Sequence, residues 1–316
     1  MQISKHHKVR QAFTKAVKLM GNRFELTVVS DDEIRAQECI CEAIAEIQRI
    51  ENLLTTYSEQ SETYRINQDA GLAAVNVSEE TFNLIQRSLK ISQLTQGAFD
   101  ISYGSIDKNL WNFNTAIKSL PDKQTAAAMV RLINYRNIIL DEIKCTVFLK
   151  EPGMRIGFGG IGKGYAAERA KMILLEMGIE SGIINASGDL AVWGSQPNGE
   201  AWTIGIVNPN QAGTPFSLLK INNMAIATSG NYEKFIMIDG KKYSHTINPR
   251  TGLPVTGIKS VTMMGPNAEI ADAMATPVMI MGIRTGLDMV NQIKNLEAIL
   301  IDDNNTIHTS NNIRFN

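Results

Sequence analysis

The sequence predicts a single compact α+β domain, a mixed sheet with packed helices, and three observations support this fold class. Helical periodicity and short β-rich segments share the chain but do not alternate regularly, which argues against a doubly wound parallel sheet. No low-complexity linker or fixed-period repeat divides the 316 residues. Hydrophobic residues make up 44 % and charged residues 20 % of the chain, values typical of a globular protein with a sizeable core.

The first half of the chain is predicted to be mostly helical. Arg23–Val29 is rich in β-forming residues and predicts a strand. Ser30 or Asp31 is then expected to cap a helix whose apolar residues recur at helical spacing as far as Leu54. Two more helices are predicted at Ser78–Leu94 and Asp122–Ile133. A hairpin is predicted with its two strands at Arg136–Leu140 and Lys144–Leu149.

The second half is predicted to be richer in strands. A helix over Tyr165–Met177 ends at Gly178, and the Asp239-Gly240 pair indicates a hairpin turn. A last helix over Asn267–Met281 precedes a hairpin around Asp303-Asn304. The strands between these helices are expected at Ile183–Asn185, Ala191–Trp193, Thr203–Val207, Phe216–Ile221, Ala225–Thr228, Lys234–Ile238 and Ser260–Met264.

Charge and composition limit which partners and which cellular location are expected for the protein. The formal net charge is −1, so nucleic acid is not an expected partner. The three cysteines, Cys39, Cys41 and Cys145, are an odd number and are expected to be free thiols. No stretch approaches the roughly 18 apolar residues of a membrane span, and Met1–Val9 lacks the apolar core of a signal peptide. The expected location is the cytoplasm, or the periplasmic face of the inner membrane if a leader has been removed.

A glycine-rich segment, 157–164, matches two phosphate-binding motifs at once. Gly157, Gly159 and Gly162 fit G-x-G-x-x-G, and the same segment fits G-x-x-x-x-G-K through Lys163. Both nucleotide-binding interpretations fail on context, because Gly164 stands where a P-loop needs Ser or Thr and no acidic residue ends a following strand. The segment therefore predicts either an anion site at a helix N-terminus or a tight turn without a ligand.

A candidate metal-binding pair lies on the helix for which Asn267 is the expected N-cap. Asp272 and Thr276 are four residues apart and therefore share one helix face. A carboxylate and a hydroxyl are hard oxygen ligands suited to Mg²⁺ or Ca²⁺, although such a pair is more often only solvated. Pro277 removes the helical partner of the Ala273 carbonyl, which can kink the helix beside the pair.

His245 is the candidate general base. It follows the Asp239-Gly240 turn and precedes the turn-rich segment 248–254, whereas the other histidines lie near the ends of the chain. A histidine between a strand and a loop can titrate near neutral pH and accept a proton. The residue alone also leaves a structural role open.

The most specific segments, in chain order, are Thr56–Ser58 with Arg65–Asn67, Gly97–Asp100, Gly159–Ala166, Asn185–Asp189, Ala227–Tyr232, Tyr243–His245 with Asn248–Gly252, and Ala271–Asp272 with Ala275–Thr276. In this order they resemble the ApbE family, the FAD:protein FMN transferases. Each segment is weak alone, but their common order is specific. The match begins at about Met20, so residues 1–19 are expected to form an N-terminal extension and residues 20–316 the domain.

The resemblance implies an ApbE-like, T-fold-like domain with FAD as the donor substrate. The residues implied to line the flavin nucleotide site are Met20, Tyr57, Ala98, Phe99 and Asp100, with Lys163 and Thr246 nearby.

The resemblance also implies a magnesium-dependent reaction. Mg²⁺ would be held by Asp272, Thr276 and the backbone carbonyl of Gly160. His245 would deprotonate a Thr or Ser hydroxyl of a partner protein, and the alkoxide would attack the FMN phosphorus and release AMP. The implied acceptor is a flavoprotein subunit such as those of sodium-translocating quinone reductase or of electron-transport complexes. A divalent ion that spreads pyrophosphate charge and a base that activates a poor nucleophile suit this chemistry.

One position departs from the family pattern, and other functions stay open. Many members have Asp-Leu-Gly where this chain has Ile156-Gly157-Phe158, so an acidic contact to the cofactor is absent at Gly157. The nearest alternative function is a Mg²⁺-dependent pyrophosphatase that hydrolyses FAD to FMN and AMP. A carrier that holds FAD without turnover is disfavoured by the intact Asp272, Thr276 and His245. A nicotinamide oxidoreductase is disfavoured by the context of the glycine loop.

Overall fold

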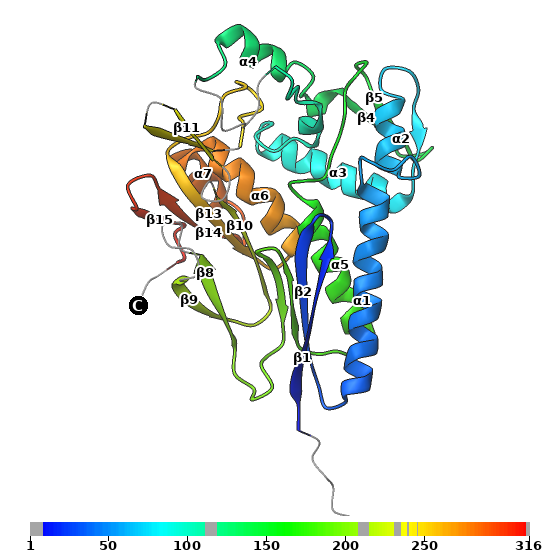
Figure 1. Cartoon of the computed structure of the whole chain (residues 1–316), viewed down its shortest axis with the longest axis vertical. Coiled ribbons are helices and arrows are strands. Elements are labelled where there is room, and N and C mark those ends of the chain that lie inside the picture. The colour runs from blue at the N-terminus through cyan, green and yellow to red at the C-terminus, as the bar shows by residue number, and fades with distance from the viewer. Residues whose placement is uncertain are drawn as a thin grey trace, which may run out of the picture.

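An eight-stranded antiparallel sheet forms the centre of the molecule, and helices cover one of its faces (Figure 1). The computed structural model describes residues 9–110, 119–207, 215–230, 235–238, 240–244 and 246–313. In spatial order the strands of the sheet are β1 (Gln11–Leu19), β2 (Asn22–Ser30), β6 (Gly182–Ala186), β7 (Asp189–Trp193), β10 (Met224–Gly230), β13 (Ile258–Gly265), β14 (Glu297–Asp302) and β15 (Ile307–Thr309).

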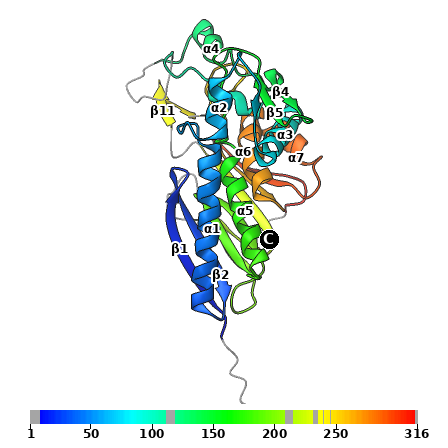
Figure 2. The same ribbon diagram turned by 90° about the vertical axis from the view of Figure 1, so that its right-hand side faces the viewer.

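The helices lie over the sheet in the same order as the strands beneath them. The covering helices are α1 (Glu33–Leu54), α5 (Gly162–Glu176), α6 (Ala268–Met281) and α7 (Ile283–Val290). Helix α1 contacts β1 and β2, α5 contacts β6 and β7, and α6 contacts β10 and β13. Figure 2 shows α1 and α5 side by side in front of the strands. No described helix is both long and apolar enough to span a bilayer.

Smaller elements surround one end of this helical layer. They are α2 (Glu62–Gln68), β3 (Val75–Asn76), α3 (Glu79–Leu94), η1 (Ile101–Ser105), α4 (Lys123–Met129), η2 (Tyr135–Asn137), β4 (Ile138–Asp141) and β5 (Thr146–Leu149). Two further hairpins are β8 (Trp202–Val207) with β9 (Pro215–Ile221), and β11 (Phe235–Ile238) with β12 (Lys241–Ser244). The β11–β12 hairpin packs its inward side chains, Ile236 and Ile238, against the end of α4.

Strand alternation explains how the sheet separates two cores. In β7, Leu190 and Val192 face the β8–β9 hairpin, whereas Ala191 and Trp193 face the helices. The hairpin contributes Trp202 to the smaller core on its side of the sheet. Since both faces of β7 are covered, all five of its residues are buried.

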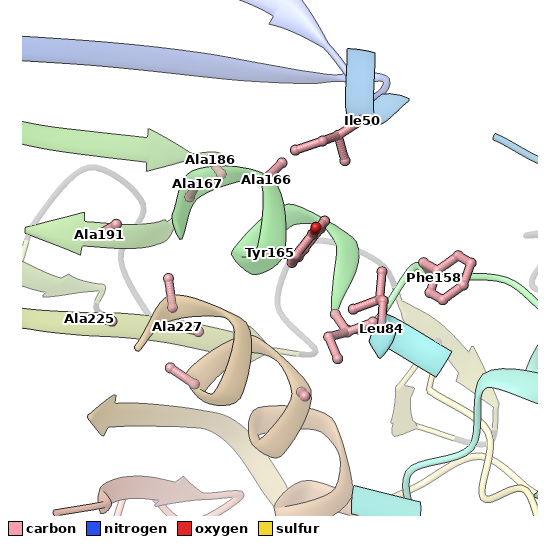
Figure 3. Close-up of a cluster of buried hydrophobic side chains, with 14 of the residues drawn as sticks. Ile50, Leu84, Phe158, Tyr165, Ala166, Ala167, Ala186, Ala191, Ala225 and Ala227 are labelled. Atoms are coloured by element: carbon pink, nitrogen blue, oxygen red, sulfur yellow. The ribbon is translucent and has the colours of Figure 1, made fainter. Parts of the chain in front are cut away.

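Alanines bring α5 and α6 unusually near to the sheet and to each other. Figure 3 shows Ala167 of α5 near Ala186 and Ala191 on the neighbouring strands, whereas Ala166 lies beside Ile50 of α1. All of these side chains are fully buried. Because an alanine side chain is a single methyl group, the helix backbones can approach closely, and this closeness positions the groups described in the next section.

Helix caps show where the sequence predicted boundaries well and where it did not. The predicted caps Ser78 of α3 and Asn267 of α6 are confirmed by their side-chain hydrogen bonds. The predicted cap of α1 was wrong, because Asp32 accepts the bond from the Arg35 N–H while Ser30 still belongs to β2. Helix α4 ends at Met129, four residues before the predicted end.

Some elements were not predicted. Residues Gln11–Leu19, placed by the sequence in an N-terminal extension, form the edge strand β1 and pair with β2 along their whole length. Helix α2 begins at an unpredicted cap, Ser61, whose hydroxyl accepts from the Tyr64 N–H. Both elements are short of continuous apolar residues, so periodicity alone gives them little signal.

A network of ion pairs ties the helices together on their outer side. Arg49 of α1 donates two hydrogen bonds of 2.8 Å to Glu80 of α3 and also bonds Glu46 on its own helix. The Tyr165 hydroxyl of α5 donates to the same Glu80 at 2.6 Å. Hydrogen bonds from Arg49 hold the pKa of both Glu46 and Glu80 below their ordinary value of 4.5.

This network predicts a dependence of stability on acid. Because the folded-state pKa of Glu80 is lowered, its stabilising contribution is present above about pH 4.5 and is lost as the pH falls through the lower folded value. We expect Glu80→Gln to reduce the free energy of unfolding at pH 7 by about 1 kcal/mol, given the partial exposure of the pair. The difference from wild type should shrink in urea titrations near about pH 3.

The exposed Arg23–Glu25 pair supplies a matched control. Glu25→Gln should change the free energy of unfolding by less than about 0.5 kcal/mol at either pH. A Glu80→Gln deficit that stays constant between the two pH values would contradict the assignment.

Candidate active site

The glycine-rich loop lies where several distant segments of the chain meet. A side chain at Gly162 would lie 3.4 Å from the Cε of Met20, which sits in the β1–β2 turn. A side chain at Gly160 would lie 3.6 Å from the ring of Phe99, which follows α3. The loop thus places predicted flavin-lining residues beside the predicted phosphate-binding segment.

Met20 occupies a backbone conformation that methionine rarely adopts. Its φ is +51° and that of the following Gly21 is +71°, as in a tight two-residue hairpin turn. Asn or Gly is the usual residue at the first position of such a turn, because a side chain there is strained. The turn places Met20 beside the start of α5, at Gly162.

Helices α5 and α6 cross most closely at Gly164. A Cβ on Gly164 would lie 2.2 Å from the Ala268 carbonyl oxygen and 2.7 Å from the Asp272 Cβ, so only glycine fits there. The Gly164 N–H donates a hydrogen bond of 2.9 Å to Oδ2 of Asp272. This N–H belongs to the first turn of α5, where backbone donors lack helical partners and the helix dipole favours an anion. The predicted metal ligand is therefore held at the helix N-terminus for which the sequence left open either an anion site or a tight turn without a ligand.

Lys163 connects Asp272 to a second buried carboxylate. Its ammonium contacts Oδ2 of Asp189 directly and lies 3.7 Å from Oδ1 of Asp272. The exposed fractions are 25 % for the Lys163 side chain, 5 % for Asp189 and 9 % for Asp272, so water screens these charges only weakly.

The charges in this cluster shift one another's pKa. Burial lowers the pKa of Lys163, but the carboxylates of Asp272 and Asp189 outweigh it and raise the value to about 12, so the ammonium is permanent. Burial raises the pKa of Asp189, the Asp272 charge adds to the shift, and Lys163 opposes it. Two carboxylates enclosed with one ammonium favour the approach of further positive charge.

The second predicted metal ligand is oriented from the sheet. Thr276 lies one turn after Asp272 on α6, and its hydroxyl is 3.1 Å from the hydroxyl of Ser229 on β10. Ser229 shares the helical face of β10 with Ala225 and Ala227, as alternation requires. The predicted i, i+4 pair therefore points toward the sheet and the start of α5. The Gly160 carbonyl as the third metal ligand stays a prediction.

Asp100 shapes the turn that carries Ala98 and Phe99. One of its carboxylate oxygens accepts from the N–H and the hydroxyl of Ser102, and the other accepts from the Tyr135 N–H at 2.8 Å. Burial raises its pKa, while these hydrogen bonds oppose the shift. Its role in flavin binding stays a prediction, and its observed side-chain contacts are with the protein itself.

Tyr57 and Thr246 lie on two loops, and of these only the Tyr57 loop has a described neighbour in the glycine-rich segment. Tyr57 is 93 % exposed, and the neighbouring Thr56 methyl group is the atom nearest a Cβ built on Gly157, at 3.9 Å. The carbonyl of Thr246 accepts from the Val255 N–H at 2.9 Å. His245 lies outside the described residues, so its role as a base also stays a prediction.

Three residues of the site were not assigned a role from the sequence: Asp189, Ser229 and Arg250. Arg250 donates to the carbonyls of Thr95 and Gln96, which ties the loop after Thr246 to the turn before Ala98. A usable signal exists for the other two residues. Asp189 alternates with Ala191 and Trp193 in β7, and Ser229 alternates with Ala225 and Ala227 in β10. Both polar side chains therefore lie on the face of the sheet that the helices cover.

Comparison with known proteins agrees with this geometry. The family model described as the ApbE family matches residues 20–300. The chain belongs to the ApbE family. A relative from Klebsiella pneumoniae (strain 342) named "FAD:protein FMN transferase" is 32 % identical over 299 residues, which cover 94 % of this chain and 91 % of that protein.

Solved ApbE structures share the fold over nearly the whole chain. The ApbE protein from Thermotoga maritima has a TM-score of 0.85 and 27 % identity, covering 95 % of this chain and 97 % of its own. The flavin transferase ApbE from Vibrio cholerae has a TM-score of 0.83 at 23 % identity, covering 96 % and 98 %. The predicted α+β class and the resemblance to the ApbE family are thereby confirmed.

The α5–α6 crossing predicts a specific cost for enlarging Gly164. We expect Gly164→Ala to lower the free energy of unfolding by about 1–3 kcal/mol, because the added methyl group overlaps the Ala268 carbonyl. Gly159→Ala is the matched control, since a Cβ there meets no atom within 4 Å and should cost less than about 1 kcal/mol. Equal unfolding midpoints for the two variants in urea would show that the helices separate without cost.

Proposed function

We propose that this chain transfers FMN from FAD to a Thr or Ser hydroxyl of a partner protein and releases AMP. The observation that supports this best is that Asp272 of α6 is hydrogen-bonded to the first turn of α5, beside Lys163 and one turn from Thr276. A carboxylate, a hydroxyl, the positive end of the α5 dipole and an ammonium together suit a magnesium pyrophosphate. The names of the relatives agree with such a substrate.

The residues present fit a divalent cation. Asp272 and Thr276 share one face of α6, and both side chains are oriented by partners on other elements, Gly164 and Ser229. Proline at position 277 leaves the Ala273 carbonyl without its usual helical donor, which keeps this turn of α6 adjustable. Asp272, Thr276 and the Gly160 carbonyl would hold Mg²⁺, which supplies charge neutralisation at the pyrophosphate.

The protein's own groups have distinct tasks in the reaction. Lys163 and the first turn of α5 bind and orient phosphate oxygens, and Met20 and Phe99 contact the loop from the side assigned to the flavin. His245 accepts the proton of the acceptor hydroxyl. The hydroxyl oxygen then forms a bond to the FMN phosphorus, and the bond from that phosphorus to the bridging oxygen breaks. AMP leaves with this oxygen, and the acceptor keeps FMN as a phosphoester.

Labelling of an acceptor tests the reaction directly. We expect FAD, Mg²⁺ and a flavin-acceptor subunit of a sodium-translocating quinone reductase to yield a fluorescent protein band on a denaturing gel. Chelation of the metal with EDTA should abolish the band, and added Mg²⁺ should restore it. Release of FMN and AMP without a labelled band would instead identify a pyrophosphatase, and bound FAD with neither product would identify a carrier.

Two variants separate metal binding from proton transfer. Asp272→Asn should abolish both Mg²⁺ binding and labelling, because it removes the charged ligand. His245→Ala should slow labelling by about 100-fold or more while Mg²⁺ affinity, measured by calorimetry, stays within about twofold. His308→Ala is the matched control, because that imidazole pairs with Asp302 in the distant β14–β15 hairpin. Equal loss of metal binding in His245→Ala would exclude the base role.

A further inference from the structure

The one ammonium in the described part of the site stands between two buried carboxylates but is not shared equally. Lys163 contacts Asp189 directly, whereas its distance to Oδ1 of Asp272 is 3.7 Å, longer than a hydrogen bond. The stem of a lysine is long and flexible, so a small rotation would bring the ammonium into full contact with Asp272. The group that holds the Lys163 ammonium beside Asp189 therefore determines whether the Asp272 carboxylate can bind another cation.

Asp189 is placed to exert that hold. It begins β7 directly after a tight turn in which Ser187 has a φ of +56° and Gly188 a φ of +101°. The Asn185 side chain closes this turn by accepting from the Gly188 N–H at 2.8 Å. Asp189 pairs with Ala186 of β6, and β10 flanks β7 on its other side, so the backbone of Asp189 is held within the sheet and does not follow Lys163 if the lysine moves.

We propose that Asp189 is a positioning residue that holds Lys163 away from Asp272 and so keeps Asp272 available to the divalent cation. The proposal rests on the proposed function, in which Asp272 is a metal ligand. Asp189 itself touches neither metal nor substrate. In its absence, Lys163 pairs with the one carboxylate that remains beside it and competes with the cation for Asp272.

Metal affinity measured without FAD tests this competition independently of turnover. Titration of the intact protein with Mg²⁺ in a calorimeter should show at least tenfold weaker binding for Asp189→Asn than for wild type. The asparagine keeps the shape of the side chain but loses the charge that retains Lys163. Unchanged affinity in Asp189→Asn would overturn the proposal.

The double variant distinguishes an effect through Lys163 from a direct effect of the Asp189 charge. In a Lys163→Met background no ammonium can compete, so adding Asp189→Asn should weaken Mg²⁺ binding by less than threefold. A loss of threefold or more in that background would mean that Asp189 acts on the cation by itself, and would overturn the proposal. Thermal melts of all three variants confirm that the protein measured is folded.

A distant carboxylate and the labelling assay keep the outcomes separable. Asp302→Asn, in the β14–β15 hairpin, should leave Mg²⁺ affinity within about twofold of wild type. If wild type binds Mg²⁺ and the variants behave as expected but no acceptor is labelled, the proposed function fails while the role of Asp189 stands. If acceptor is labelled and Asp189→Asn binds Mg²⁺ normally, the role of Asp189 fails alone.

Discussion

The site depends on how closely α5 can approach α6. Gly164 is the residue at the crossing, and its missing side chain lets its N–H reach the Asp272 carboxylate of the other helix. The alanines beneath both helices allow the same closeness toward the sheet (Figure 3). A large residue at any of these positions would separate the helices, and the carboxylate would lose the helix terminus that stabilises its charge.

The junction also encloses three charged side chains. Carboxylates and an ammonium are enclosed where solvent screens poorly, and the pKa of Lys163 is raised to about 12 by Asp272 and Asp189 despite the opposing effect of burial. Buried charges of this kind are costly unless they are paired and hydrogen-bonded. Here the Gly164 N–H offsets the cost for Asp272, and the ammonium of Lys163 offsets it for Asp189.

Side chains fix the loops around the α5–α6 crossing by hydrogen bonds to backbone N–H and carbonyl groups. Asn67 bonds both the N–H and the carbonyl of Ile156, directly before the loop, at 2.7 and 3.0 Å. Arg250 fixes the turn before Ala98 by donating hydrogen bonds to the carbonyls of Thr95 and Gln96. At Gly157, where many family members have Asp, the nearest neighbour of an added Cβ is Thr56, so this departure leaves space beside the exposed Tyr57 loop rather than a strained contact.

The sequence by itself determined the fold class, most helix and strand positions, and the i, i+4 pairing of Asp272 and Thr276, because these depend on local periodicity, caps and turn residues. It also identified the family, because ordered motifs are a property of the chain. Only the tertiary structure brought Asp189 to Lys163 and Ser229 to Thr276, because these contacts join strands and helices distant in sequence. The edge strand β1 likewise depends on its partner β2, since a strand's backbone hydrogen bonds are completed by its neighbour.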